Sequence, residues 1–207
     1  HAYVPNLTFD AVEGQWKAGE FSYINQDAPY YQALYHARLA EGLQKLGYVI
    51  RPTRDAFEIE GVSQELISQF SRRSRFIEEK AAELGILNEK AKSQLGAFYR
   101  ESKNKDFTYV ELVEHWCGAL SHKNQRALKS LYNDALAHPD RIPDRNGNER
   151  AFMHTALDHI LERISQVDEK RLVAEALRMG IGQCDAESLW NEERNSYDIL
   201  RASVGER

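Results

Sequence analysis

A cluster of cations at Ser71–Arg75 is the feature of this sequence with the clearest potential for chemistry. It contains Arg72, Arg73 and Arg75. Lys80 follows about one turn further on, in a chain whose formal charge is −5. Cations that share one side of a helix can contact phosphates and release counterions. The same spacing also permits ion pairs, in which case the cluster is a solvated face. The acids available for such pairs are Glu78, Glu79 and Glu83.

An aromatic residue and a cation are adjacent at Trp16 and Lys17, in a segment predicted to form a hairpin. Such a pair can stack a nucleobase and contact a phosphate of single-stranded nucleic acid. The alternative is that Trp16 packs within the hairpin. A second basic stretch, 90–105, is interleaved with aromatic residues that include Phe98 and Tyr99.

Residues that could act as metal ligands or nucleophiles are scattered along the chain. A single imidazole such as His1 cannot hold a metal ion without two or more partners, and His115 and His122 lack a third ligand at useful spacing. A tyrosine, with a pKa of about 10, is a poor nucleophile unless it is activated. Tyr30 and Tyr31 begin a helix whose other apolar residues indicate a core, so we expect a structural role for them.

Composition narrows the classes of protein. Hydrophobic residues make up 42% of the chain, which is enough for a sizeable core. The net negative charge requires any nucleic-acid contact to come from a local basic patch. No glycine-rich phosphate loop of the helicase type occurs, so we expect no nucleotide hydrolysis by this chain. Cys117 and Cys184 lack metal-ligand spacing, which favours a reducing, cytoplasmic location. No apolar stretch reaches the roughly 18 residues of a membrane span, so we expect no membrane insertion.

The apolar spacing predicts the elements that must position these residues. The first part of the chain is expected to form strands at 2–9 and 15–18, a helix from Asp27 to Gly47, and strands at 48–51 and 56–59. From Ser63, which is expected to cap a helical run that Gly85 closes, the period changes to three and four residues. Further helices are expected at about 89–100, 108–118, 122–137, 149–164 and 168–179. The fold class is therefore α+β, with a small antiparallel sheet segment at the N-terminus and a mostly α-helical region after it.

The segment 139–148 is the best candidate for a linker. It contains two prolines, a glycine and several other turn-forming residues. We therefore expect a domain boundary there, with residues 1–138 before it and a small helical module at 149–207 after it.

Several segments, in their order and spacing, resemble the TrwC-type family of conjugative relaxases over about residues 1–120. These segments are His1–Phe9, Gly14–Ala18, the helix Tyr35–Gly47, Phe57–Val62 and Phe70–Arg73. The catalytic domain of that family nicks one strand of plasmid DNA at the transfer origin. The resemblance implies that 1–138 is the C-terminal part of a relaxase domain, and that 149–207 is a connector preceding a helicase domain. It also implies that this chain is a fragment.

The resemblance further implies a mechanism, which is metal-assisted transesterification by a tyrosine. Three histidines of the family hold a divalent metal ion such as Mg, Mn or Zn, and His1 takes the place of the third. The ion would neutralise charge that accumulates on the phosphate oxygens. The family's tyrosine nucleophiles and its first two histidines lie upstream of His1. We therefore assign no catalytic residue in this chain and expect no tight metal binding by it alone.

The partners that the resemblance implies are single-stranded DNA at the transfer origin, the relaxosome and the coupling proteins of type IV secretion. The residues expected to contact the DNA are Trp16, Lys17, Arg72, Arg73, Arg75 and Lys80. Two other interpretations remain open. One is a non-catalytic helical module that docks protein partners or connects domains, and the other is an unrelated helical regulator whose β-rich beginning is coincidental.

Overall fold

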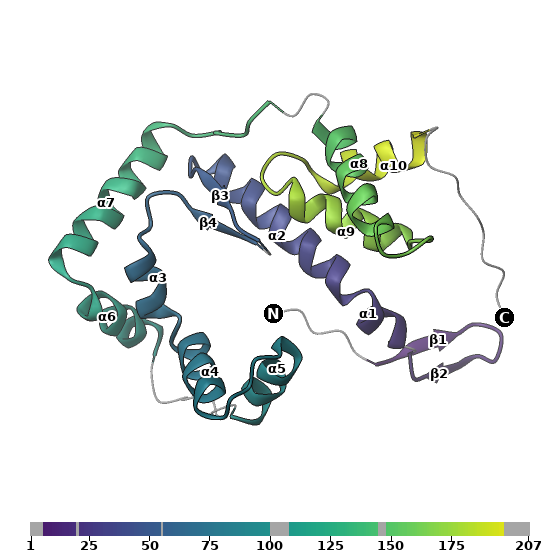
Figure 1. The fold of residues 1–207 in the computed structure, drawn as a ribbon, viewed down its shortest axis with the longest axis horizontal. Helices are drawn as coiled ribbons and strands as arrows, with labels where there is room; N and C mark the ends of the chain where they lie inside the picture. The colour runs from purple at the N-terminus through teal and green to yellow at the C-terminus, as the bar shows by residue number, and fades with distance from the viewer. Residues whose placement is uncertain (1–5, 20, 55, 100–107, 145–147, 197–207) are drawn as a thin grey trace. The chain divides into compact units, whose positions relative to one another are not determined.

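The chain forms two small antiparallel hairpins and a series of α-helices in the computed structural model (Figure 1). The structure describes residues 6–19, 21–54, 56–99, 108–144 and 148–196. This architecture confirms the α+β class predicted from the sequence. Within these ranges, no helix combines the length and the apolar character needed to cross a membrane.

The first hairpin joins β1 (Thr8–Asp10) to β2 (Gln15–Lys17), with Phe9 opposite Trp16. Its turn is held by the Asp10 carboxylate, which accepts hydrogen bonds from the backbone N–H groups of the turn at 2.9 and 3.1 Å. The second hairpin joins β3 (Ile50–Pro52) to β4 (Phe57–Ile59). Both strand pairs were expected, and β3 and β4 are each one residue shorter than the strands predicted at 48–51 and 56–59.

The helices fall into three groups along the chain. Between the hairpins lie α1 (Ser22–Gln26) and α2 (Ala28–Lys45). After the second hairpin come α3 (Gln64–Phe70), α4 (Arg72–Glu83), α5 (Glu89–Phe98), α6 (Tyr109–Ala119) and α7 (His122–Ala137). The last group is α8 (Asn148–Leu161), α9 (Glu169–Met179) and α10 (Ala186–Asn195).

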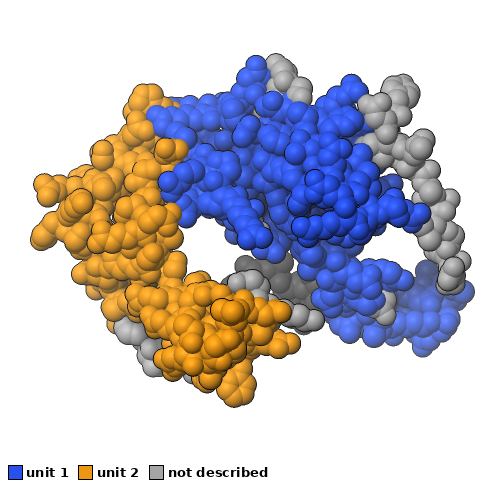
Figure 2. Space-filling view, in the orientation of Figure 1, with its two compact units in different colours: residues 1–58, 139–207 blue, residues 59–138 orange. Residues whose placement is uncertain are grey.

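The chain divides into two compact units, which are coloured separately in Figure 2. Unit 1 contains residues 1–58 and 139–207, and unit 2 contains residues 59–138. The second segment of unit 1 begins at Pro139. The expected grouping of 1–138 against 149–207 differs from this division, however, because the helices after the linker share a core with α2.

The core of unit 1 lies where α2 packs against α9, with α8 and α10 alongside (Figure 1). The apolar residues of α9 recur at helical spacing, and its Leu172, Val173 and Ala176 are fully buried. From α2 the core receives Ala33 and Ala37, whose small side chains permit close approach of the two helices. The larger residues of α2 that the sequence indicated as core are mostly outside it. Those more than one-third exposed are Tyr31, Tyr35 and Leu39.

Polar contacts tie the linker region and the last helices to α2. The backbone N–H groups of Asp140 and Arg141 donate to the carbonyls of Lys45 and Gln44, at 3.2 and 2.9 Å. The buried side chain of Gln44 also donates from Nε2 to the carbonyl of Gly182 at 2.8 Å. The C-terminal end of α2 is therefore held by main-chain contacts from segments about a hundred residues away.

Unit 2 is built from α3 to α7, and side-chain caps define where several of these helices begin. Ser63 accepts a hydrogen bond from the N–H of Leu66, which confirms the predicted cap. Thr108 and Glu111 form a reciprocal capping box at the start of α6. The helical run expected from Ser63 to Gly85 is interrupted at Ser71, whose ψ of 46° is not helical. The stretch 71–75 has no apolar side chain whose burial would hold a continuous helix.

Candidate nucleic-acid interface

Two arginines of the basic cluster lie on the exposed side of α4. Arg72 is exposed and makes no hydrogen bond or ion pair with any residue that the structure describes. Arg75 has only a loose pair, in which its Nε lies 3.7 Å from Oε1 of Glu79 and both side chains are at least 60% exposed. Ion pairs this exposed contribute little to stability. Both guanidinium groups can therefore meet an anion without losing a strong intramolecular contact.

The position of this cluster on its helix is also informative. α4 begins at Arg72 and has no acidic residue in its first turn. The N-terminus of a helix carries a partial positive charge, so arginines there are unfavourable for the isolated helix, whereas an anion is stabilised. A local departure from helix preference of this kind is typical of functional sites.

Arg73, by contrast, has a structural contact. Its Nη2 donates a hydrogen bond of 2.9 Å to the carbonyl of Gly96 in α5. Gly96 also permits close packing of the two helices, because a Cβ at this position would lie 2.8 Å from Cδ1 of Ile77. Arg73 therefore joins α4 to α5, and its guanidinium group is already partly used within unit 2.

Lys80 and the acids of α4 confirm part of the ion-pair alternative. Lys80 Nζ lies 2.6 Å from Oε2 of Glu83, and this hydrogen bond is the main cause of the raised pKa of Lys80. Glu78 accepts from Lys92 of α5 at 2.9 Å. The cations of the cluster therefore differ. Lys80 is paired with an acid, whereas Arg72 and Arg75 lie on the exposed side of α4, which we call its open face.

An aromatic row adjoins this face. The ring of Phe76 in α4 meets that of Tyr99, just after α5, with centroids 5.7 Å apart. Tyr99 in turn meets Phe98, with centroids 5.1 Å apart. The sequence indicated only that aromatic residues were interleaved with cations in this region, and the packing of α4 against α5 is what brings Phe76 into contact with Tyr99.

The structure separates Trp16 from Lys17, although both are expected DNA contacts. Successive residues of a strand point to opposite faces, and Trp16 pairs with Phe9 at a centroid distance of 5.3 Å. Lys17 Nζ lies 2.7 Å from Asp10 and 2.6 Å from Glu13. Trp16 is 65% exposed and could still stack on a base. Lys17 is neutralised by two carboxylates, which disfavours a phosphate contact.

Metal ligands are not grouped in the part of the chain that can be described. His1 lies outside the described residues. Within them, no set of three or more histidine, cysteine, aspartate and glutamate side chains is arranged to hold a metal ion. His115 and His122 are not part of such a set among those residues. We derive no step through a metal ion from the described residues.

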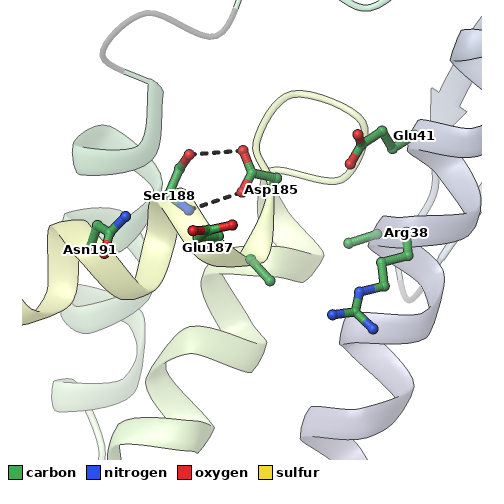
Figure 3. Close-up of a pocket in the computed structure, with 8 residues that line it drawn as sticks. Arg38, Glu41, Asp185, Glu187, Ser188 and Asn191 are labelled. Carbon is green, nitrogen blue, oxygen red and sulfur yellow. Dashed lines mark hydrogen bonds between the residues drawn. The ribbon is translucent and has the colours of Figure 1, made fainter.

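Unit 1 contains a polar pocket. It has a volume of about 520 Å³ and lies between α2 and the beginning of α10 (Figure 3). The carboxylate of Asp185 accepts hydrogen bonds from the N–H and the hydroxyl of Ser188, at 2.9 and 2.8 Å. Three acids and one arginine are among its lining residues, namely Glu41, Asp185, Glu187 and Arg38. This excess of carboxylates disfavours phosphate binding.

A family of DNA-processing proteins fits this chain. Residues 1–122 match the family model described as TrwC relaxase. Because the match covers more than half of the chain, the protein belongs to the TrwC relaxase family. Membership shows a relaxase-type function in conjugation, with DNA as the ligand, and the matched range contains α4 and α5 completely. Comparisons with curated proteins and with solved structures found no match.

Proposed function

We propose that this chain is the C-terminal part of a conjugative relaxase domain, and that the open face of α4 holds phosphates of single-stranded DNA at the transfer origin. The observation that carries the proposal is Arg72, which is exposed and unpaired among the described residues at the N-terminus of a helix. Arg75, three residues on, supplies a second cation. Contacts of this kind give affinity and position the strand without reading its sequence.

The chemistry of the complete domain is proposed to be transesterification. A tyrosine oxygen bonds to the scissile phosphorus, and the bond from phosphorus to the neighbouring sugar oxygen breaks. The tyrosine hydroxyl loses its proton as the new bond forms, and the released sugar oxygen takes up a proton. A divalent metal ion, with His1 as one of three histidine ligands, would neutralise charge on the phosphate. No tyrosine of this chain is proposed as the nucleophile.

The environment of Tyr30 supports this assignment. Its hydroxyl accepts a hydrogen bond of 2.9 Å from Nε1 of Trp190, and its ring packs at the edge of the unit 1 core. A tyrosine held in this way contributes to packing between α2 and α10.

We also propose that residues 149–207 connect the relaxase domain to a helicase domain. The packing of α9 against α2 supports a connector that is continuous with the relaxase part rather than loosely tethered to it. The relaxosome and the coupling proteins of type IV secretion are the proposed protein partners, and the cytoplasm is the proposed location.

The proposal is tested by replacing Arg72 and Arg75 together with alanine. We expect weaker binding of a dye-labelled single-stranded oligonucleotide, to a similar degree for several sequences. The slope of log affinity against log salt concentration should become shallower by about 0.7 for each lost phosphate contact. Fluorescence anisotropy over a series of salt concentrations measures both quantities. Arg73→Ala is the control from the same cluster: it removes one positive charge, whereas the double variant removes two, and we expect it mainly to lower stability, because Arg73 binds the carbonyl of Gly96.

An unchanged salt slope in the double variant, with the helical circular dichroism retained, would contradict a DNA-binding role for α4. The solvated-face alternative predicts that outcome, with a loss of only about 0.2–1 kcal/mol of stability for the Arg75 pair. The same oligonucleotides, incubated with the chain and a divalent metal ion, should give no covalent product. A tyrosine-linked product would contradict the assignment of the nucleophile to another part of the domain.

A further inference from the structure

The aromatic row beside α4 is unusually exposed. It is made of Phe76, Tyr99 and Phe98, whose exposed fractions are 39%, 42% and 83%. An exposed aromatic ring does not contribute the hydrophobic stabilisation that its burial would give. Single exposed apolar residues are common on protein surfaces, but rings in mutual contact form a patch that is typical of binding sites.

Cations adjoin this row on α4. Arg72 lies four residues before Phe76, so the two side chains are neighbours on one side of the helix. Lys80 lies four residues after Phe76 on the same helix. Residues 72–99 contain six lysines and arginines against four acids, whereas the whole chain carries a net charge of −5. The row therefore lies in a locally basic segment of an acidic protein.

The support beneath the row is well defined. The hydrogen bond from Arg73 to Gly96 and the contact of Ile77 with Gly96 join α4 to α5. Because the rings come from both helices, this junction determines their spacing. A binding surface gains precision when its side chains stand on such packed elements.

We infer that Phe98, with Tyr99 and Phe76 behind it, is a stacking platform for a base of single-stranded DNA, next to the phosphate contact of Arg72. The inference rests on the proposed function and adds to it a group that recognises bases rather than phosphates. Stacking on aromatic rings tolerates any base, because every base has a π-face. The adjacent cations favour a polyanionic strand over an apolar protein segment as the occupant. An apolar segment would remove water from the cations without supplying an opposite charge.

The test compares Phe98→Ala with the unchanged full chain on two sets of oligonucleotides. In one set, the fully based strands, every nucleotide carries its base. In the other, a run of nucleotides is abasic, while all phosphates remain. Loss of one stacked base should weaken binding of the fully based strand by roughly 5- to 150-fold. Phe98→Ala should bind the abasic strand as well as the unchanged chain does, because the lost contact is to a base. Phe98→Trp should retain affinity, whereas Phe98→Leu, which is apolar but has no π-face, should not.

Tyr109→Ala is the control, because Tyr109 is 76% exposed in the same unit but lies outside the row. It should leave both affinities unchanged. If Phe98→Ala weakens both strands equally, or leaves both unchanged while circular dichroism shows the native fold, the platform is wrong. If Phe98→Ala leaves the affinity for the oligonucleotide unchanged, while replacement of Arg72 and Arg75 lowers it, this inference is overturned and the proposed function stands. Absence of strand binding by the unchanged chain would instead contradict the proposed function.

Discussion

At the scale of single residues, the first hairpin shows how neighbouring charges set one another's ionisation. Lys17 donates to Asp10 and Glu13, and these hydrogen bonds lower the pKa of both carboxyl groups and raise the pKa of Lys17. A lowered carboxyl pKa means that the pairs stabilise the folded hairpin above the ordinary carboxyl pKa. This contribution is lost as the pH falls through the lowered pKa.

Replacing Lys17 with methionine should therefore raise the pKa of Asp10 towards its ordinary value, because its largest stabilising contact is removed. The stability of the folded hairpin should also depend less on pH in the acidic range in this variant. An NMR titration of the side-chain carboxyl carbons measures the pKa directly. Lys45→Met, which removes the partner of Glu41 on α2, should leave the titration of Asp10 unchanged. An Asp10 pKa that stays low in Lys17→Met would show that the ion pair is not its cause.

At the scale of elements, two glycines of unit 1 have opposite surroundings. Gly180 ends α9 inside the core, where an added Cβ would clash with Sγ of Cys184 and lie 2.8 Å from Cδ2 of Phe152. Gly42 lies within α2, and an added Cβ there would have nothing within 4 Å. The first glycine is needed for close packing, and the second only adds backbone freedom to the unfolded chain.

Gly180→Ala should consequently destabilise the protein by about 1–3 kcal/mol, the usual range for overpacking a core. Gly42→Ala should stabilise it by about 0.5–1 kcal/mol, because alanine is the better helix former. Urea unfolding followed by circular dichroism measures both differences. Adding Cys184→Ala to Gly180→Ala removes the nearest atom and should recover part of the loss. Equal stability of the two glycine variants would mean that the end of α9 is not packed as described.

At the scale of the whole molecule, unit 1 is assembled from two distant parts of the chain. Residues 1–58 contribute α2, and residues 139–207 contribute α8 to α10. Their common core is apolar and continuous, so cutting the linker breaks a covalent connection without exposing that core.

Limited trypsin digestion should cut first in or next to 139–148, where Arg141, Arg145 and Arg150 offer sites. The two products should then elute together in size-exclusion chromatography, and separate only in denaturant. In the variant Ala37→Glu, a charge replaces a buried alanine between α2 and α9, so the cut products should separate without denaturant. Dissociation of the unchanged protein after a single cut would contradict a shared core.

The sequence by itself determined those features that depend on neighbouring residues. The strand pairs, the cap at Ser63 and the helical period of α9 were all predicted, because β-propensity, capping and amphipathic spacing are local properties. The basic cluster at Arg72–Arg75 was likewise evident from composition alone. The short helix α1 and the helix α10 were not predicted, since few apolar residues mark them.

Only the tertiary structure decided which side chains of these elements are buried and which contact one another. The small Ala33 and Ala37 of α2 are buried in the core, whereas Tyr30 is only partly buried and Tyr31 and Tyr35 are exposed. Arg73 binds the carbonyl of Gly96 while Arg72 stays open, and the aromatic row forms between α4 and the end of α5. The partners in these contacts are about twenty or more residues apart along the chain. Local spacing carries no information about such contacts, since they form only when packed helices bring distant segments together.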